Sequence, residues 1–145
     1  MKKLLKIGLW VVIGGFVVIQ LVPYGRNHTN PPVVQEPNWD SPETRALAEQ
    51  ACFDCHSNET TWPWYTNVAP VSWLVQRDVD EGRHRLNFSD WQNGRRDSHE
   101  TDEMAEVVQR GSMPPAIFLT MHPEARLTDA EKQQLINGLQ ATTGN

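Results

Sequence analysis

The stretch "ACFDCHSNETTWPWY", residues 51–65, holds the only two cysteines of this 145-residue chain. Cys52 and Cys55 are separated by two residues, and His56 follows them directly. Four kinds of site use such a pair: a short disulfide, a thiol redox centre, part of a zinc site, and a covalent attachment point for haem. The chemistry that each site requires distinguishes between them.

Haem attachment fits the pattern best. A disulfide across two residues closes a loop too short to add much stability, and a thiol oxidoreductase would place the motif beside a βαβ pattern that is not evident here. A structural zinc needs four ligands, and only two thiolates lie close together. The C-x-x-C-H spacing instead allows two thiols, one helical turn apart, to add across the two vinyl groups of a porphyrin. We therefore predict one covalent haem c, attached through Cys52 and Cys55, with His56 as the proximal iron ligand.

Residues 1–22 are a hydrophobic segment that begins with lysines. Lys2, Lys3 and Lys6 precede a run that is apolar from Ile7 to Val22 except for Gln20. Counted from Leu4 to Val22, the segment has 19 residues, close to the ~20 that cross a hydrocarbon core, and it lacks a small-residue cleavage site. The sequence therefore predicts an uncleaved signal anchor, a single-pass transmembrane helix. By the positive-inside rule, the rest of the chain would lie on the periplasmic side of the inner membrane.

Residues 23–40, "PYGRNHTNPPVVQEPNWD", are rich in proline and asparagine and show no helical or strand period. This composition is typical of an extended tether. Three of the 13 basic residues precede it, so the remaining chain carries 10 basic and 18 acidic residues, a formal net charge of −8. This charge excludes nucleic acid as a partner, because it repels a phosphate backbone.

Residues 41–145 are expected to form a mostly helical, loop-rich domain. Ser41 and Pro42 are typical of a helix start that leads into Cys52. A second helix is expected over residues 70–82 with Gly82 at its end, and a third over residues 98–111. Thr128 and Glu131 form a capping box for a fourth. The large aliphatic side chains are few, so a large apolar cofactor would supply buried surface that the chain lacks.

The sixth iron ligand has several candidates: Met104, Met113, Met121, His84, His99 and His122. Met104 lies in an expected helix, where core packing explains it, and His84 and His99 lie in polar surroundings typical of the surface. Met113 precedes two prolines, which cannot continue a helix and hold the chain in an extended loop. A thioether in such a loop can point inward. We therefore predict Met113 as the second metal ligand, with Met121 and His122 as alternatives.

Longer stretches resemble the bacterial haem-binding domain family, which contains single-haem c-type cytochrome-like domains. The likeness runs from "TNPPV" at Thr29 to the C-terminal helix, through "CFDCHSNETTWPWY", "APVSWLVQRDVDEGR", "LNFSDW" and "GSMPPAIFLTMHPEARLTDAEKQQL". The resemblance implies a small, mainly α, cytochrome c-like fold wrapped around one haem over residues 41–145. It also implies haem c on Cys52 and Cys55, with His56 and Met113 as axial ligands.

The expected function is electron transfer rather than catalysis. A His/Met pair fills both axial positions of a haem iron and leaves no site for a substrate. The chain would then carry single electrons between redox proteins at the membrane. The alternative is a haem-based sensor, ligand-binding or peroxidase-like domain in which the sixth position is open or labile.

Overall fold

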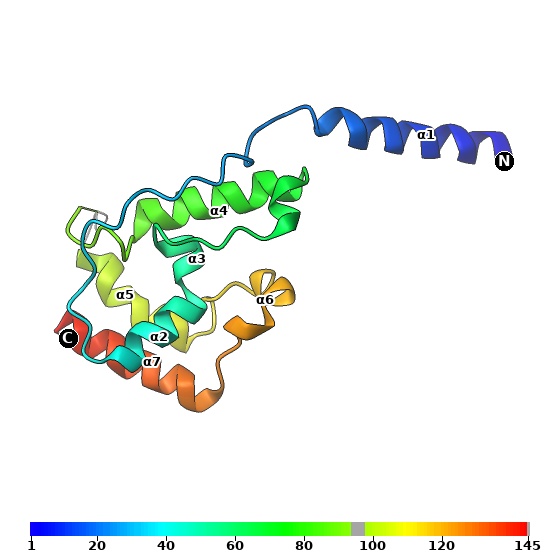
Figure 1. The fold of residues 1–145 in the computed structure, drawn as a ribbon. Coiled ribbons are helices and arrows are strands. Elements are labelled where there is room, and N and C mark those ends of the chain that lie inside the picture. Colours follow the sequence, from blue (N-terminus) through cyan, green and yellow to red (C-terminus); the bar gives the residue numbers. More distant parts are fainter. Residues whose placement is uncertain (94–97, 145) are drawn as a thin grey trace. The chain divides into compact units, whose positions relative to one another are not determined.

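The computed structural model describes residues 1–93 and 98–144, with the backbone alone for residues 98–102. The described chain is mainly helical (Figure 1). Its elements are α1 (Lys2–Ile19), α2 (Pro42–Ala51), α3 (Phe53–His56), η1 (Trp64–Asn67), α4 (Val71–Arg85), α5 (Ser98–Gln109), α6 (Phe118–Met121), η2 (Pro123–Ala125) and α7 (Asp129–Thr143). The expected helical fold class is confirmed for this part of the chain. Two compact units are present: residues 1–29 with 62–78, and residues 30–61 with 79–145.

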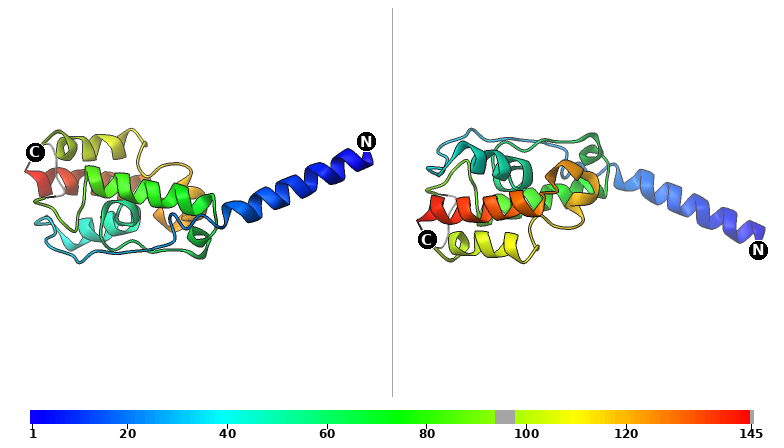
Figure 2. Two further views of the ribbon diagram at one scale, coloured as in Figure 1. Left: turned by 90° about the horizontal axis from the view of Figure 1, so that it is seen from above. Right: turned by 90° about the horizontal axis from the view of Figure 1, so that it is seen from below.

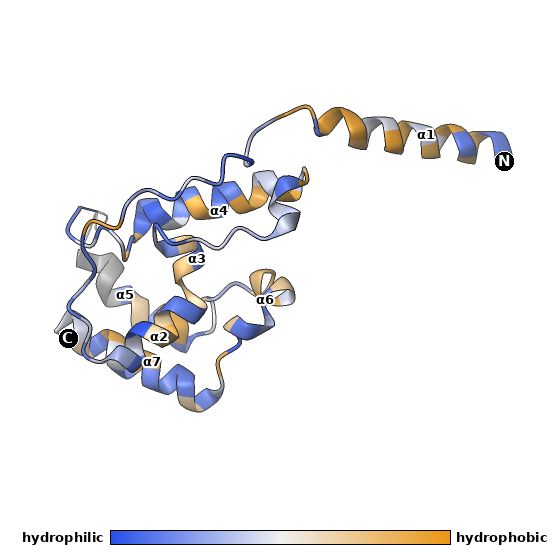
Figure 3. Ribbon diagram, viewed as in Figure 1, coloured by the Kyte–Doolittle hydropathy of each residue, from blue (hydrophilic) through white to orange (hydrophobic). Residues whose placement is uncertain are grey.

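The prediction of an N-terminal membrane anchor was wrong. Among the described residues, no helix is both long and apolar enough to cross a membrane. Helix α1 ends at Ile19, and its first two turns carry the three lysines (Figure 3). Its uninterrupted apolar part, residues 7–19, is only about 20 Å long, against the ~30 Å of a hydrocarbon core. The predicted location, with the anchor in the inner membrane and the rest of the chain in the periplasm, depended on that span and is therefore not supported.

The end of α1 is tied to the rest of the first unit through Gln20. The Gln20 side-chain amide donates to the Ala69 carbonyl oxygen at 2.9 Å, and its oxygen accepts from the Ala69 N–H at 3.0 Å. The Arg26 guanidinium donates to the same Gln20 oxygen at 3.0 Å. The polar residue that interrupts the apolar run therefore makes specific contacts within this unit.

The second unit has its own hydrophobic core. Helices α5 and α7 pack side by side, and α2 lies against α7 (Figure 2). The buried cluster includes Leu47, Ala48, Phe53, Leu86, Phe88, Met104, Ala105, Val108, Leu135, Ile136 and Leu139. Gly138 allows α7 to approach α2 closely, because a Cβ atom there would lie 2.0 Å from the Thr44 hydroxyl oxygen.

The four helices expected in residues 41–145 are present as α2, α4, α5 and α7. Ser41 caps α2 by accepting from the Thr44 N–H, and the capping box of Thr128 and Glu131 opens α7. Gly82, by contrast, does not end a helix: α4 continues through it to Arg85. Glycine at this position is explained by the backbone atoms packed against it, which belong to the site described below.

Part of the predicted tether belongs to the second unit. Residues 30–39 contain no helix, but the N–H groups of Val34 and Gln35 both donate to the Ser89 carbonyl, at 2.8 and 3.1 Å. The Trp91 N–H donates to the Gln35 carbonyl at 2.9 Å. An isolated parallel bridge joins Gln35 to Asp90. These bonds satisfy backbone groups that a proline-rich segment cannot pair internally.

Candidate functional site

Cys52, Cys55 and His56 lie on a single helical turn, residues 52–56, which we call the attachment turn. Helix α2 ends at Ala51, Cys52 occupies its C-cap, and α3 follows at once as one turn from Phe53 to His56. The Cys52 carbonyl accepts from the N–H groups of Cys55 at 3.2 Å and His56 at 2.9 Å. This turn places both sulfur atoms and the imidazole within one short segment, as the predicted attachment requires.

Cys52 and Cys55 are not joined by a disulfide in the structure. Burial, with a smaller contribution from Cys55, raises the pKa of the Cys52 thiol to about 12. A thiol that stays protonated at neutral pH is a poor redox nucleophile. The raised pKa of the Cys52 thiol therefore disfavours a thiol redox centre. In the described part of the chain, no group of three or more His, Cys, Asp and Glu side chains is arranged to hold a metal ion.

The His56 imidazole is oriented by two backbone carbonyls. Its Nδ1 atom lies 3.1 Å from the Gly82 oxygen and 3.1 Å from the Leu86 oxygen. Both partners are acceptors only, so Nδ1 carries the hydrogen and donates. The ring lone pair then resides on Nε2, the tautomer in which a histidine binds metal through Nε2 while its other N–H is held by a second partner.

Gly82 is what allows α4 to come this close. A Cβ atom at this position would lie 2.3 Å from the Cys55 carbonyl oxygen and 3.2 Å from the Cys55 Cβ. The backbone of α4 therefore lies directly on the attachment turn. The sequence placed Gly82 at a helix end, but its role is this close approach, which no local pattern indicates.

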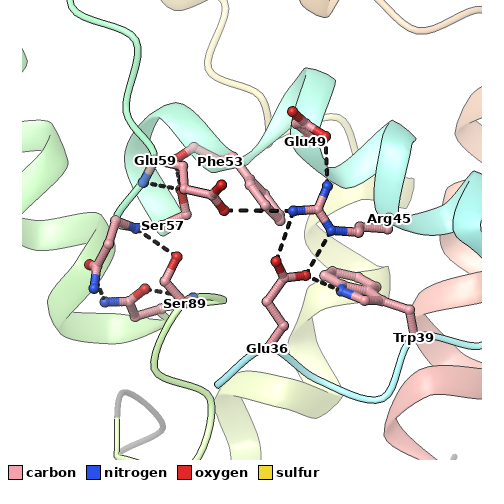
Figure 4. Close-up of polar contacts among 10 residues, drawn as sticks. Glu36, Trp39, Arg45, Glu49, Phe53, Ser57, Glu59 and Ser89 are labelled. Carbon is pink, nitrogen blue, oxygen red and sulfur yellow. Dashed lines mark hydrogen bonds and ion pairs between the residues drawn. The ribbon is translucent and has the colours of Figure 1, made fainter. Parts of the chain in front are cut away.

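Residues 57 and 58, directly after His56, are held in place by polar contacts, several of which are drawn in Figure 4. Ser57 donates from Oγ to the Phe53 carbonyl at 2.8 Å, and the Asn58 N–H donates to Ser89 Oγ at 2.9 Å. The Arg83 guanidinium donates to the Ser57 carbonyl at 2.7 Å. Burial is the main cause that lowers the pKa of Arg83. These contacts fix the exit of the attachment turn.

The start of the attachment turn is held by a charged cluster, also drawn in Figure 4. Arg45 forms a two-pronged pair with Glu36, at 2.8 Å for both bonds, and contacts Glu49 at 2.7 Å. Its guanidinium carbon lies 5.2 Å from the centre of the Phe53 ring. The Arg45 hydrogen bond is the main cause that lowers the pKa of Glu36. Since Phe53 lies between the two cysteines, this cluster supports the attachment turn from the α2 side.

The candidate sixth ligands lie in different places. Met104 is buried in the core, 5% exposed, as predicted, and His84 is exposed on α4. The side chain of His99 lies outside the described residues. Met113 follows α5, with its N–H donating to the Val107 carbonyl at 3.2 Å, and Met121 ends α6.

His122 lies next to the attachment turn. Its Nδ1 atom is 3.8 Å from Asp54 Oδ2, and Asp54 lies between the two cysteines in sequence. Burial is the main cause that raises the pKa of Asp54. The structure therefore brings the end of α6 to the attachment turn, which the sequence alone did not indicate.

Comparison with known proteins identifies the family. Residues 14–141 match a sequence model described as "Haem-binding domain". The match covers most of the chain, which therefore belongs to the haem-binding domain family, as its motifs indicated. It begins inside α1, so the matched region includes the end of that helix. No curated protein and no solved structure gives a significant match.

Proposed function

We propose that this haem-binding domain carries one haem c, attached through Cys52 and Cys55, and transfers single electrons between redox proteins. The observation that carries the proposal is the orientation of His56. Two carbonyls hold Nδ1, which leaves the lone pair on Nε2, and the two cysteines stand on the same turn without a disulfide between them. Membership of the family supports a haem cofactor in general.

The covalent attachment requires nothing beyond the two thiols and the two vinyl groups of a porphyrin. In each addition, sulfur bonds to one vinyl carbon and the hydrogen of the thiol goes to the other, so no atom is lost. The thiols must be reduced for this step, and Cys52 and Cys55 are not oxidised to a disulfide. The fixed turn of α3 sets their separation.

His56 and Met113 are the proposed axial ligands. A haem iron held by His and Met exchanges one electron and keeps no open coordination position. The chain's own part is to keep the His56 ring in one tautomer and one orientation, through the carbonyls of Gly82 and Leu86. Met113 would supply the thioether from the loop that follows α5. An electron carrier of this type binds no small-molecule substrate, and its partners are other redox proteins.

The attachment is tested by the mass of the denatured full chain, produced with a c-type maturation system. The proposal predicts a mass increase of one haem that survives denaturation and extraction with acidified solvent. Replacing both cysteines, Cys52→Ala with Cys55→Ala, should abolish it. A matched control is His84→Ala, which replaces an exposed histidine on α4 and leaves both thiols in place. A chain that binds haem but releases all of it on denaturation would overturn the covalent proposal.

A further inference from the structure

The segment that joins α5 to α7, residues 111–127, is held in place by its own hydrogen bonds; we call it the distal segment. At its start, the Val107 carbonyl accepts from both the N–H and the hydroxyl of Ser112, at 3.0 and 3.1 Å. Near its end, the Arg126 guanidinium donates twice to the Leu119 carbonyl, at 3.2 and 3.3 Å. The conformation of this segment is therefore defined even where its side chains reach the surface.

Three large apolar side chains of the distal segment are nevertheless exposed. Met113 is 38% exposed, Ile117 64% and Met121 54%. Single exposed apolar residues are ordinary, whereas apolar side chains that gather into one exposed patch mark a binding surface. Met113 is itself the proposed sixth ligand, and Ile117 and Met121 lie on the same segment, so an apolar group bound there would cover them.

His122 connects this segment to the attachment turn. Its ring stacks on Phe118, with centroids 4.0 Å apart and planes 8° from parallel. Its Nδ1 atom donates to the Glu124 carboxylate at 2.9 Å and faces Asp54 Oδ2 at 3.8 Å. The Gln50 side chain, from α2, donates to the Glu124 carbonyl at 2.5 Å. The His122 side chain is 12% exposed, so this contact is largely shielded from water.

We propose that His122 is a positioning residue that holds the distal segment against the attachment turn, so that Ile117 and Met121 form an apolar wall on the haem. This inference rests on the haem site proposed above. The contact of His122 with Asp54, between the two cysteines, brings the end of α6 beside the group that those cysteines carry. The exposed thioether and aliphatic side chains match the apolar rim of a porphyrin. His122 acts on the sixth ligand through the segment and is not itself that ligand.

The test compares three variants of the full, haem-loaded chain. His122→Ala removes both the ring stack and the N–H donor. His122→Asn keeps a donor close to the position of Nδ1. His84→Ala is the matched control, because His84 is an exposed histidine on α4. Each variant is measured for covalent haem by denatured mass, for the far-red methionine–ferric absorption band, and for CO binding by the reduced protein.

We expect His122→Ala to retain covalent haem, to lose most of the methionine–ferric band, and to bind CO, which the parent does not, because the loss of a hydrogen bond of ordinary strength weakens the hold on the distal segment roughly tenfold. His122→Asn should recover part of the band, and His84→Ala should match the parent. An unchanged band and no CO binding in His122→Ala would overturn the inference, as would a parent spectrum typical of two histidine ligands. Loss of covalent haem in the parent chain would instead refute the proposed function.

Discussion

Replacing Gly82 with alanine is the perturbation that most directly probes how α4 supports the attachment turn. The added Cβ atom would lie 2.3 Å from the Cys55 carbonyl oxygen, whereas real Cβ contacts stay above 3.0 Å. The two backbones must therefore separate by about 0.7 Å. A movement of that size would lengthen the bond from His56 Nδ1 to the Gly82 oxygen, now 3.1 Å, to about 3.8 Å, beyond hydrogen-bonding distance.

Two effects oppose each other in this variant. Alanine in a helix interior is more favourable than glycine by about 1 kcal/mol, so helix propensity alone predicts stabilisation. Overpacking against a backbone costs about 1–3 kcal/mol, and the lost hydrogen bond about 1 kcal/mol more. The clash should dominate, and we expect Gly82→Ala to lower the free energy of unfolding by about 2 kcal/mol. The weakened hold on His56 should also weaken its bond to iron.

The assay is chemical unfolding of the full chain followed by circular dichroism, together with the absorption spectrum of the haem-loaded protein. Gly15→Ala is the matched control, because Gly15 is a helical glycine in α1 and an added Cβ there would meet no atom from outside its own helix within 4 Å. The control should be unchanged or slightly stabilised. The reasoning would be refuted if Gly82→Ala were more stable than the parent and its haem absorption spectrum were the same as that of the parent.

Three further predictions concern the sixth ligand, the charged cluster and a helix cap. Met113→Ala should remove the methionine–ferric band and open the iron to CO; an unchanged spectrum would reassign the ligand to Met121 or His122. The lowered pKa of Glu36 means that its stabilising contribution is complete above the ordinary value of ~4.3 and is lost as pH falls through the folded value. As the pH is lowered into the acid range, the free energy of unfolding of Glu36→Gln should therefore fall by about 1 kcal/mol less than that of the parent. A fall as large as that of the parent would contradict this account. Ser41→Ala should destabilise the chain by about 1 kcal/mol in chemical unfolding, with Ser41→Asp retaining most of that stability.

Local signals in the sequence predicted the helix starts well. Ser41 and Thr128 each cap a helix with a side-chain oxygen, a contact made within three residues. Such short-range chemistry is visible in the order of residues alone. The same holds for the attachment turn, because Cys52, Cys55 and His56 are neighbours along the chain. The buried stripe of α7, which includes Leu135 and Leu139, followed from its spacing.

Features that depend on distant residues could not be predicted in this way. The close approach of Gly82 to Cys55 joins positions 27 residues apart, and the contact of His122 with Asp54 joins positions further apart still. The prediction for α1 was wrong for a different reason. Its apolar run was counted through Val22, but the helix ends at Ile19, and the side chain of Gln20 pairs with the backbone of Ala69. Counting apolar residues does not show where a helix ends.

The central claim is a six-coordinate haem c held by His56 and Met113, and its most direct test is the absorption spectrum of the purified full chain, oxidised and reduced, with and without CO. The account predicts a c-type spectrum with the far-red methionine–ferric band and no response to CO. A high-spin spectrum that shifts when CO is added would contradict it. The iron would then have an open position, and a ligand-binding or peroxidase-like role would replace electron transfer.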